Sequence, residues 1–483
     1  MDFALCPKYN RVLNEYKVKV MKKDTICAIS TPLGVNGIGI VRLSGPDTYK
    51  IIEEIFVAGK NLKQGKRIKI KDIPSHTIHY GYVVEGRRRI DEVLLTIMKS
   101  PKTYTKEDIA EINCHGGIIP LKEVLSVCIK KGARLASPGE FTMRAFLNGR
   151  IDLTQAESVL EIITSQTEKS LEISLLKLEG SFSEKINNIK EKIVRYLSQF
   201  EYLIDFPEEE DIKAIERVGE KEIDVLIKEI EKIISSSKRG KILFEGVKVA
   251  IIGRTNVGKS SLLNKLIEEE RAIVSEIPGT TRDIIQEVIN IKGIPVKIID
   301  TAGIRKTKGK IEKMGVEKAV EWMKKAEINI LILDGSQKLK KDDKKLFEKI
   351  KGNNYIIAIN KVDLPLKIEI EKIKKIFSDE KIVFISAKEG KGIDELKEKI
   401  FKIVEKGEKV SEGEIYLNLR QEELIRKLKK ALIGCLNSIK KNLPLEISTE
   451  YLRQAICEID YLTGNRYNDE VLENIFSNFC IGK

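Results

Sequence analysis

An apolar, strand-like run followed by a glycine-rich loop occupies residues 247–260, near the middle of the chain. The run is β-branched and ends at Gly253, and the loop reads G-x-x-x-x-G-K-S. Glycine lets successive backbone N–H groups point at phosphate oxygens at the start of a helix, where the helix dipole favours an anion. We therefore predict a strand, a phosphate-binding loop and an amphipathic helix, with Lys259 reaching the β- and γ-phosphates and Ser260 ligating Mg²⁺.

Four further motifs follow this loop in an order that is typical of an α/β nucleotide-binding domain with a mainly parallel sheet. They are G-T-T-R-D (279–283), D-T-A-G (300–303), N-K-V-D (360–363) and S-A-K (386–388). Asp363 selects the base, because its carboxylate can accept from N1–H and the exocyclic amine of guanine, whereas adenine has an acceptor at N1. The set resembles that of the Ras-like translation-factor class of GTPases and predicts GTP rather than ATP.

These motifs and the segment before G-T-T-R-D define the predicted nucleotide site. The predicted GTP-binding residues are Asn256, Val257, Gly258, Lys259, Ser260, Ser261, Ser275, Glu276, Ile277, Pro278, Gly279, Thr280, Thr281, Asp300, Thr301, Ala302, Gly303, Asn360, Lys361, Asp363, Ser386 and Ala387. Within this set, Ser260 and Thr281 are the predicted direct Mg²⁺ ligands.

The residue after the D-T-A-G glycine is Ile304, although in Ras a glutamine at that position orients the attacking water. Another group must therefore position the water. Residues 271–283 resemble the K-loop of cation-activated GTPases, in which backbone carbonyls and a phosphate-loop Asn hold K⁺ where other GTPases place an arginine finger. By this resemblance, the K⁺ ligands are Asn256, Ser275, Ile277 and Thr280.

The segments that flank the nucleotide domain differ from it and from each other. Residues 24–149 combine β-type runs, such as 77–84 and 92–98, with one apolar helix-like segment at 118–129, which indicates an α+β domain. Two long amphipathic helices are predicted after residue 153, because apolar residues recur there at three- and four-residue spacing. An acidic run at 205–211 separates the two helices, and we expect the second to end across residues 235–240.

A second helical block, residues 411–479, follows the nucleotide domain. Neither helical block is large enough for a good core, so we predict one helical domain built from both, with the nucleotide domain inserted into it. The predicted organisation is therefore an N-terminal extension (1–23, with Met21 as an alternative start), an α+β domain (24–149), a first helical segment (150–243), a Ras-like P-loop GTPase domain (244–408) and a second helical segment (409–483).

Polar residues crowd two glycine-containing segments of the α+β domain, residues 104–117 and 137–153. They are Glu107, Glu111, Asn113, His115, Glu140, Arg144 and Arg150. Two interpretations stay open: these side chains line a pocket for a polar heterocycle, or Asp108 and Glu140 cap helices while His115 packs beside a turn. Cys114 and His115 are not a metal-binding pair, because neighbouring side chains in a strand point to opposite faces.

Composition limits the class of protein. No run of 18 apolar residues occurs and the N-terminus lacks an apolar signal region, so we expect a cytoplasmic protein without a membrane span. The net charge of +13 favours a polyanionic partner such as RNA, although much of the excess is lysine scattered over helix faces. The seven cysteines include no C-x-x-C pair, which disfavours a disulfide scaffold and a cysteine-based zinc site.

The chain ends in F-C-I-G-K, and with this string the sequence resembles the MnmE (TrmE) family of tRNA-modifying GTPases over nearly all of residues 24–483. The other strings are D-T-I-x-A-x-x-T-P-x-G, G-I-V-R-x-S-G, Y-T-x-E-D, E-I-N-C-H-G-G and P-G-E-F-T-x-R-A-F-L-N-G-R-I-D-L. The resemblance implies a folate-binding-like N-terminal domain that forms a constitutive homodimer. It places a tetrahydrofolate derivative (5-formyl or methylene) at Arg42, Glu111, Arg150 and Lys483.

The resemblance also assigns two single residues. Glu312 matches the glutamate that orients the hydrolytic water, with an exposed surface Glu as the alternative. Cys480 matches a functional tail cysteine, with a small buried hydrophobe as the alternative. Arg150 stands where many members of the family have Lys, a change that preserves the charge.

The resemblance implies a K⁺-dependent GTPase that works with the flavoprotein MnmG (GidA), in a heterotetramer or larger complex that uses FAD and NADH. Together they install a (carboxymethyl)aminomethyl group at C5 of the wobble uridine of certain tRNAs, with glycine or ammonium as the amine donor. One alternative is a regulatory K-loop GTPase that binds RNA or the ribosome as an assembly checkpoint. Another is a folate-dependent transferase with a fused regulatory GTPase. The folate-type strings and the terminal F-C-I-G-K disfavour the checkpoint.

Overall fold

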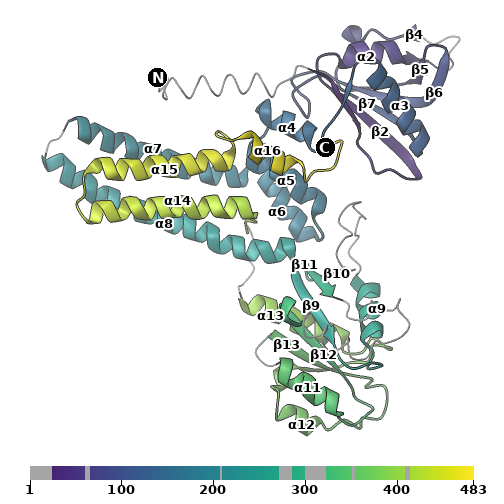
Figure 1. Cartoon of the computed structure of the whole chain (residues 1–483), viewed down its shortest axis with the longest axis vertical. Helices are drawn as coiled ribbons and strands as arrows, with labels where there is room; N and C mark the ends of the chain where they lie inside the picture. Colours follow the sequence, from purple (N-terminus) through teal and green to yellow (C-terminus); the bar gives the residue numbers. More distant parts are fainter. Residues whose placement is uncertain are drawn as a thin grey trace. The chain divides into compact units, whose positions relative to one another are not determined.

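The computed structural model describes residues 24–59, 66–206, 209–270, 286–299, 323–350, 354–407 and 414–483. They form two compact units (Figure 1): the chain up to Leu160 together with Thr463–Lys483, and Glu161–Leu462. The last residues of the chain thus belong to the unit that contains its first described residues. Within the described ranges, no helix has the length and apolar character needed to cross a membrane.

Among its described residues, the first unit has an eight-stranded sheet in the order β4-β3-β5-β6-β7-β2-β1-β8. Its strands are β1 (Ile26–Ile29), β2 (Asn36–Ser44), β3 (Phe56–Ala58), β4 (Lys66–Arg67), β5 (Thr77–Glu85), β6 (Arg88–Met98), β7 (Ile109–Gly116) and β8 (Arg134–Leu135). All pairings are antiparallel except β1 with β8. The β-type runs predicted at 77–84 and 92–98 are confirmed as β5 and β6.

The two faces of this sheet differ, as alternation along antiparallel strands leads us to expect. Helices α2 (Thr48–Ile55) and α3 (Ile118–Lys130) pack on one face, where Leu43, Leu95 and Val124 belong to one buried core. The helix predicted at 118–129 is therefore confirmed as α3. The opposite face exposes apolar side chains, among them Ile38, Ile78, Tyr80 and Leu94, which are 42–65% exposed.

A second, smaller core joins the end of the chain to the same unit. Helices α4 (Glu140–Leu147) and α16 (Asp469–Phe476) pack together with the start of α5 (Leu153–Thr164). Phe146 of α4, Leu153 of α5 and Phe476 of α16 are buried in this cluster. The C-terminal segment after α16 is thereby brought to the sheet.

In the second unit, helices from both sides of the nucleotide domain share one core. They are α7 (Ser181–Asp205), α8 (Glu209–Glu245), α14 (Leu419–Lys440) and α15 (Leu445–Thr463), with α6 (Glu168–Leu178) beside them (Figure 1). Ile189 and Ile230 lie in the same buried cluster as Leu432 and Ile459. This confirms one helical domain built from two blocks, and the break between α7 and α8 falls in the predicted acidic run.

The predicted end of the second helix at residues 235–240 is wrong, because α8 continues to Glu245. Gly240 lies inside the helix, and a Cβ there would be 2.2 Å from the carbonyl oxygen of Ile415. Ser236 Oγ also accepts from the Ile415 N–H at 2.9 Å. The small residues Ser236 and Gly240 therefore do not end the helix. They allow the segment that contains Ile415 to cross it at close range.

The described residues of the nucleotide domain contain a six-stranded sheet in the order β10-β11-β9-β12-β13-β14. The strands are β9 (Val247–Ile252), β10 (Gln286–Ile291), β11 (Ile294–Ile299), β12 (Ile328–Asp334), β13 (Asn354–Asn360) and β14 (Ile382–Phe384), and only β10 with β11 is antiparallel. Every residue of β12 is buried, as expected for a central parallel strand that is covered on both faces.

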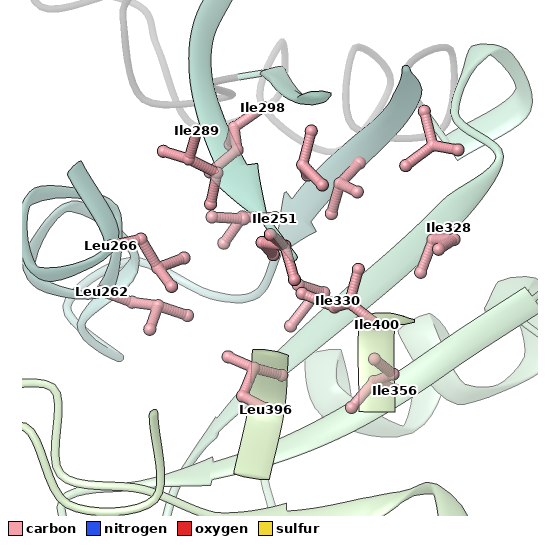
Figure 2. Close-up of a cluster of buried hydrophobic side chains, with 14 of the residues drawn as sticks. Ile251, Leu262, Leu266, Ile289, Ile298, Ile328, Ile330, Ile356, Leu396 and Ile400 are labelled. Carbon is pink, nitrogen blue, oxygen red and sulfur yellow. The ribbon is translucent and has the colours of Figure 1, made fainter. Parts of the chain in front are cut away.

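Helices cover both faces of this sheet. On one face, Leu266 of α9 (Lys259–Glu270) and Leu396 of α13 (Ile393–Gly407) lie in the cluster with Ile251 and Ile330 (Figure 2). On the other face, α11 (Lys341–Ile350) and α12 (Ile370–Lys374) pack over Ile252 and its neighbours. In sheets of this kind, ligands bind outside the carboxyl ends of the strands.

Candidate functional site

The phosphate loop connects β9, which ends at Ile252, to α9, which begins at Lys259. The strand, loop and helix predicted for this stretch are therefore confirmed. Gly258 has a φ of +101°, and a Cβ there would lie 2.2 Å from the Asn360 side-chain nitrogen. Asn256 also has a left-handed φ, +63°. The loop is thus a close turn in which Gly258 is needed both for its φ and for its contact with Asn360.

Lys259 and Ser260 stand at the first turn of α9, where the resemblance to other phosphate loops requires them. The Lys259 ammonium donates to the carbonyl oxygens of Gly253 (2.8 Å) and Arg254 (2.6 Å) across the loop. Ser260 is half-buried, and Ser261 beside it is exposed. A helix N-terminus that carries a lysine and a hydroxyl group fits a nucleotide phosphate with Mg²⁺.

Asn360, at the end of β13, joins three of the predicted motifs. Its Nδ2 donates to the carbonyl oxygen of Val257 at 2.8 Å, and its Oδ1 accepts from the Ala387 N–H at 2.9 Å. Asn360 is only 2% exposed, so these hydrogen bonds hold its side chain in one orientation. The structure therefore brings the phosphate loop, N-K-V-D and S-A-K together at one end of the sheet.

The Asp363 carboxyl group is oriented and ionised, so it can accept hydrogen bonds. Ser386 Oγ donates to its Oδ1 at 2.7 Å, and this hydrogen bond holds the pKa of the Asp363 carboxyl below its ordinary value. An ionised carboxylate offers acceptors only. Two acceptors match the N1–H and the amine of guanine, whereas N1 of adenine would face Asp363 with a lone pair.

Two aspartates that the sequence analysis missed hold the phosphate loop from the side. Asp334, the last residue of β12, accepts from the Lys361 ammonium at 2.7 Å. Asp343 on α11 accepts from Arg254 Nε at 2.7 Å. Burial alone would raise the pKa of Asp334, but hydrogen bonds from Lys361 and Ser336 bring it below its ordinary value. A signal was present, since Asp334 ends a predominantly apolar strand at the edge of the sheet where such sites form.

The remaining predicted nucleotide-site residues lie outside the described residues. They are Ser275, Glu276, Ile277, Pro278, Gly279, Thr280, Thr281, Asp300, Thr301, Ala302, Gly303 and Glu312. Of the predicted cation ligands, Asn256 and Ser260 are therefore the described ones. Their roles, and that of the K-loop, stay predictions.

The predicted folate-binding residues lie close together in the first unit. Arg42 on β2 is in register with Glu111 on β7, and Arg42 Nε donates to Glu111 Oε1 at 2.7 Å. The Arg150 guanidinium lies 4.4 Å from the centre of the Tyr104 ring, and that of Arg42 lies 5.9 Å from it. The main-chain oxygen of Lys483 accepts from the N–H of Phe141 at 3.2 Å.

The end of the chain docks onto the start of the sheet. The carbonyl oxygen of Gly482 accepts from Arg42 Nη1 (3.2 Å) and from Ser30 Oγ (3.1 Å). Gly482 has a φ of +93°, and a Cβ there would lie 2.5 Å from the Ile29 carbonyl oxygen. Cys480 is exposed, so its alternative interpretation as a buried hydrophobe is wrong. The terminal string therefore contributes main-chain groups to the same polar region.

Several polar residues of the two glycine-containing segments belong to one ion-pair network. Arg144 and Glu140 are buried and paired at 3.0 Å, and Arg144 also pairs with Glu107 (3.2 Å) and with Asp24 (2.6 Å). Arg134, which the sequence analysis missed, pairs with Glu140 at 2.6 Å. Burial would raise the pKa of Glu140 and of Asp24, but these guanidinium groups lower both below their ordinary values. This network fixes the scaffold around the Arg42–Glu111 pair.

The helix-capping interpretation is wrong for both residues. Glu140 is the first residue of α4, whose N-cap, Gly139, has no side-chain cap hydrogen bond; the Glu140 carboxylate accepts instead from the N–H of Ser137 (2.9 Å), which precedes the helix. Asp108 precedes β7 and accepts from the N–H of Ser100 (2.9 Å), so it caps no helix. His115 is exposed, with Nδ1 2.7 Å from Asp91, while Cys114 is buried. The opposite orientation of the Cys114 and His115 side chains is thereby confirmed.

A phosphate loop between a buried strand and a helix, with a guanine-type N-K-V-D motif at the end of another strand of the same sheet, defines the class: a P-loop GTPase. Residues 25–150 match the family described as the GTP-binding protein TrmE N-terminus, and residues 153–480 match the MnmE helical domain. The chain belongs to the MnmE family of tRNA modification GTPases.

Individual relatives agree with this family. The tRNA modification GTPase MnmE of Thermoanaerobacter pseudethanolicus is 46% identical over 467 residues, which cover 95% of this chain and 99% of the relative. The protein of the same name from Ligilactobacillus salivarius is 42% identical over 465 residues, or 95% and 98% of the two chains. Among solved structures, a variant of Aquifex aeolicus Era bound to GDP and aluminium fluoride is 32% identical over 39% of this chain and 67% of its own, with a TM-score of 0.27.

Proposed function

We propose that this GTPase is K⁺-dependent and acts with the flavoprotein MnmG (GidA) to install a (carboxymethyl)aminomethyl group at C5 of the wobble uridine of certain tRNAs. A tetrahydrofolate derivative supplies the one-carbon unit, and FAD and NADH act through the partner. The observation that carries this proposal is the combination, in one chain of this family, of a guanine-type nucleotide site with the Arg42–Glu111 pair beside the docked chain terminus.

In the nucleotide site, each residue has a role that follows from its chemistry. Lys259 neutralises the β- and γ-phosphates, and Asp363 accepts from the base. Ser260 with Thr281 would hold Mg²⁺, and Asn256 with Ser275, Ile277 and Thr280 would hold K⁺, which supplies positive charge at the phosphates during hydrolysis. Glu312 is proposed to orient the water, because Ile304 has no polar group for that task.

The N-terminal site combines hydrogen-bond donors, on arginine side chains, with hydrogen-bond acceptors on a carboxylate. A guanidinium and carboxylate in contact, Arg42 and Glu111, can together satisfy the amide-like edge of a pterin ring. Arg150 adds a cation, and its contact with Tyr104 limits its motion. Glu111 is half-buried and already paired with Arg42, so the desolvation of its carboxylate by a bound ligand costs less free energy than that of an unpaired carboxylate.

The homodimer proposal is supported by the uncovered face of the N-terminal sheet. Ile38, Tyr80 and Leu94 are exposed on the face that also carries Arg42 and Glu111, because all five side chains follow the same alternation across paired strands. Exposed apolar side chains grouped on a sheet face are typical of a protein interface. A second copy would then close the folate site. We further propose a cytoplasmic location and a heterotetramer or larger complex with MnmG.

The tRNA nucleoside profile of a deletion strain tests the proposed reaction. We expect the 5-modified wobble uridines to disappear and to return when the full chain is supplied, but not when the Asp363→Asn chain is supplied. An unchanged nucleoside profile would overturn the proposal. Unchanged nucleosides together with accumulating immature ribosomal subunits would favour the assembly-checkpoint alternative.

Rates of GTP hydrolysis in K⁺ and in Na⁺ test the cation. We expect faster hydrolysis in saturating K⁺, and equal rates in the two salts would remove the K-loop from the mechanism. The Glu312→Ala chain tests the water-orienting residue in the same assay. An unchanged kcat would exclude Glu312 from that role.

A further inference from the structure

We propose that Asp334 is a positioning residue for the cation site of the phosphate loop. It holds the Lys361 ammonium against the main-chain carbonyl of Asn256, and through this contact it sets the K⁺ concentration that GTP hydrolysis requires. The inference rests on the proposed role of K⁺ and of Asn256. Asp334 lies outside all five nucleotide motifs, so its assignment comes from the structure alone.

Asp334 is held rigidly at the carboxyl end of β12. Its side chain is 2% exposed, and its register partner on β13 is Asn360, the first residue of N-K-V-D. The carboxylate accepts from Ser336 N–H (3.0 Å), Ser336 Oγ (2.7 Å) and Gln337 Nε2 (3.0 Å) as well as from Lys361 Nζ (2.7 Å). Four donors from three residues leave the carboxylate one orientation, with Oδ2 toward Lys361.

Lys361 links Asp334 to the phosphate loop. Its Nζ donates to Asp334 Oδ2 at 2.7 Å and to the carbonyl oxygen of Asn256 at 3.0 Å. Asn256 and Lys361 both have left-handed φ values, +63° and +68°, which are unfavourable for residues with a Cβ. A charge-assisted hydrogen bond to the Asn256 carbonyl therefore stabilises a backbone conformation that is uncommon for non-glycine residues.

This link acts on a cation in two ways. A ligand that is already oriented loses less conformational freedom when the cation binds, so fixing the Asn256 backbone strengthens the K⁺ site. The second effect is electrostatic, because Asp334 neutralises an ammonium group that would otherwise repel a cation held by the Asn256 side chain. Loss of Asp334 weakens both effects in the same direction, and the site then needs more K⁺.

The neighbouring Asp343 provides a matched control. Its side chain is 3% exposed and it also pairs with a basic residue of the phosphate-loop region, Arg254 Nε at 2.7 Å. This contact does not involve Asn256. Asp343→Asn therefore removes a similarly buried carboxylate that pairs with the phosphate-loop region, while keeping the Asp334–Lys361–Asn256 link intact.

The test is a K⁺ titration of GTP hydrolysis by the full chain at saturating GTP, with choline chloride keeping the ionic strength constant. We expect Asp334→Asn to raise the half-activating K⁺ concentration roughly three- to tenfold, which corresponds to the net contribution of one ordinary hydrogen bond. Asp343→Asn should keep the wild-type half-activating concentration even if its Tm falls. Ser336→Ala, a milder change that removes one hydrogen bond to Asp334, should shift the titration in the same direction by less.

The outcomes separate this inference from the function on which it rests. Wild-type protein that hydrolyses GTP equally fast in K⁺ and Na⁺ overturns the cation proposal and this inference together. K⁺-activated wild type with an unshifted Asp334→Asn titration overturns the positioning role alone. An equal shift in Asp343→Asn also overturns it, because the effect would then be a general loosening of the loop. If Asp334→Asn does not fold, Ser336→Ala decides: a titration identical to the wild type overturns the inference.

Discussion

The two candidate sites of this chain are assembled in different ways. In the nucleotide domain, side chains such as Asn360 lie at the carboxyl ends of parallel strands, so the backbone carries them to one edge of the sheet. In the N-terminal unit, Arg42 and Glu111 meet through the register of two antiparallel strands, and Gly482 reaches them from the opposite end of the chain. Short motifs suffice to build the first site, whereas the second exists only when the whole unit is folded.

The largest expected effect breaks the nucleotide site at its base contact. Asp363→Asn replaces an acceptor with a donor toward guanine N1–H, and we expect the kcat/KM for GTP to fall roughly a hundredfold while xanthosine triphosphate becomes a substrate. Steady-state kinetics with both nucleotides measure this change. Unchanged GTP turnover would show that Asp363 does not read the base.

The N-terminal site should be broken by a change that lies far from Arg42 and Glu111 in sequence. Gly482→Ala forces a Cβ toward the Ile29 carbonyl at a φ of +93°, so the tail shifts and Arg42 loses its contact with the Gly482 carbonyl. We expect the affinity for 5-formyl-tetrahydrofolate, measured by calorimetry, to fall about tenfold, the equivalent of one such hydrogen bond.

Gly86→Ala is the matched control for that change. Gly86 also has a positive φ, +61°, but nothing lies within 4 Å of the added Cβ. The Gly86→Ala substitution should therefore lower the free energy of unfolding by about 1 kcal/mol and leave the folate affinity unchanged. If both variants lost folate affinity equally, backbone strain in the unit, and not the docked tail, would be responsible.

The same contrast explains what the sequence could and could not predict. The strand, loop and helix around Gly258 could be predicted because local periodicity and glycine spacing determine them. The continuation of α8 past Gly240 could not, because the reason lies in Ile415, a residue distant in sequence. Asp334 and Arg134 escaped notice for the same reason: their roles depend on partners that only the tertiary structure brings near them. The folate residues came from family resemblance, not from the chemistry of local sequence.

Acid should affect the N-terminal unit through its buried ion network. The pKa values of Asp24 and Glu140 lie below their ordinary 3.8 and 4.5. Their stabilising contribution is therefore complete above those ordinary values and is lost as the pH falls toward the lowered ones, by roughly 1.4 kcal/mol per pH unit for each carboxyl that takes up a proton only on unfolding. Hydrogen exchange of α4 peptides between pH 6 and pH 3 measures this loss.

Two substitutions test whether that network is the cause. Glu140→Gln removes the titrating group, so the exchange of α4 should depend less on pH below about 4.5, after an initial loss of stability from breaking a buried pair. Glu54→Gln is the control, because the Glu54–Lys131 pair is surface-exposed and contributes little. A wild-type acid profile in Glu140→Gln would place the acid sensitivity elsewhere.

The smallest expected effect sharpens the comparison of the two sites, because it concerns a residue that orients a ligand-binding side chain and does not itself bind the ligand. Ser386→Ala removes the hydrogen bond that orients Asp363 and lowers its pKa. The carboxylate remains ionised at neutral pH, so base selectivity should persist, while the Kd for GTP rises about fivefold for one lost hydrogen bond. Titration with a fluorescent GTP analogue measures the Kd, with the xanthine analogue as the reference for selectivity. The hydrogen bonds of Asn360 to Val257 and Ala387 are unaffected by this substitution. A much larger loss of GTP affinity would therefore mean that the nucleotide site depends on side-chain pairs as strongly as the N-terminal site does.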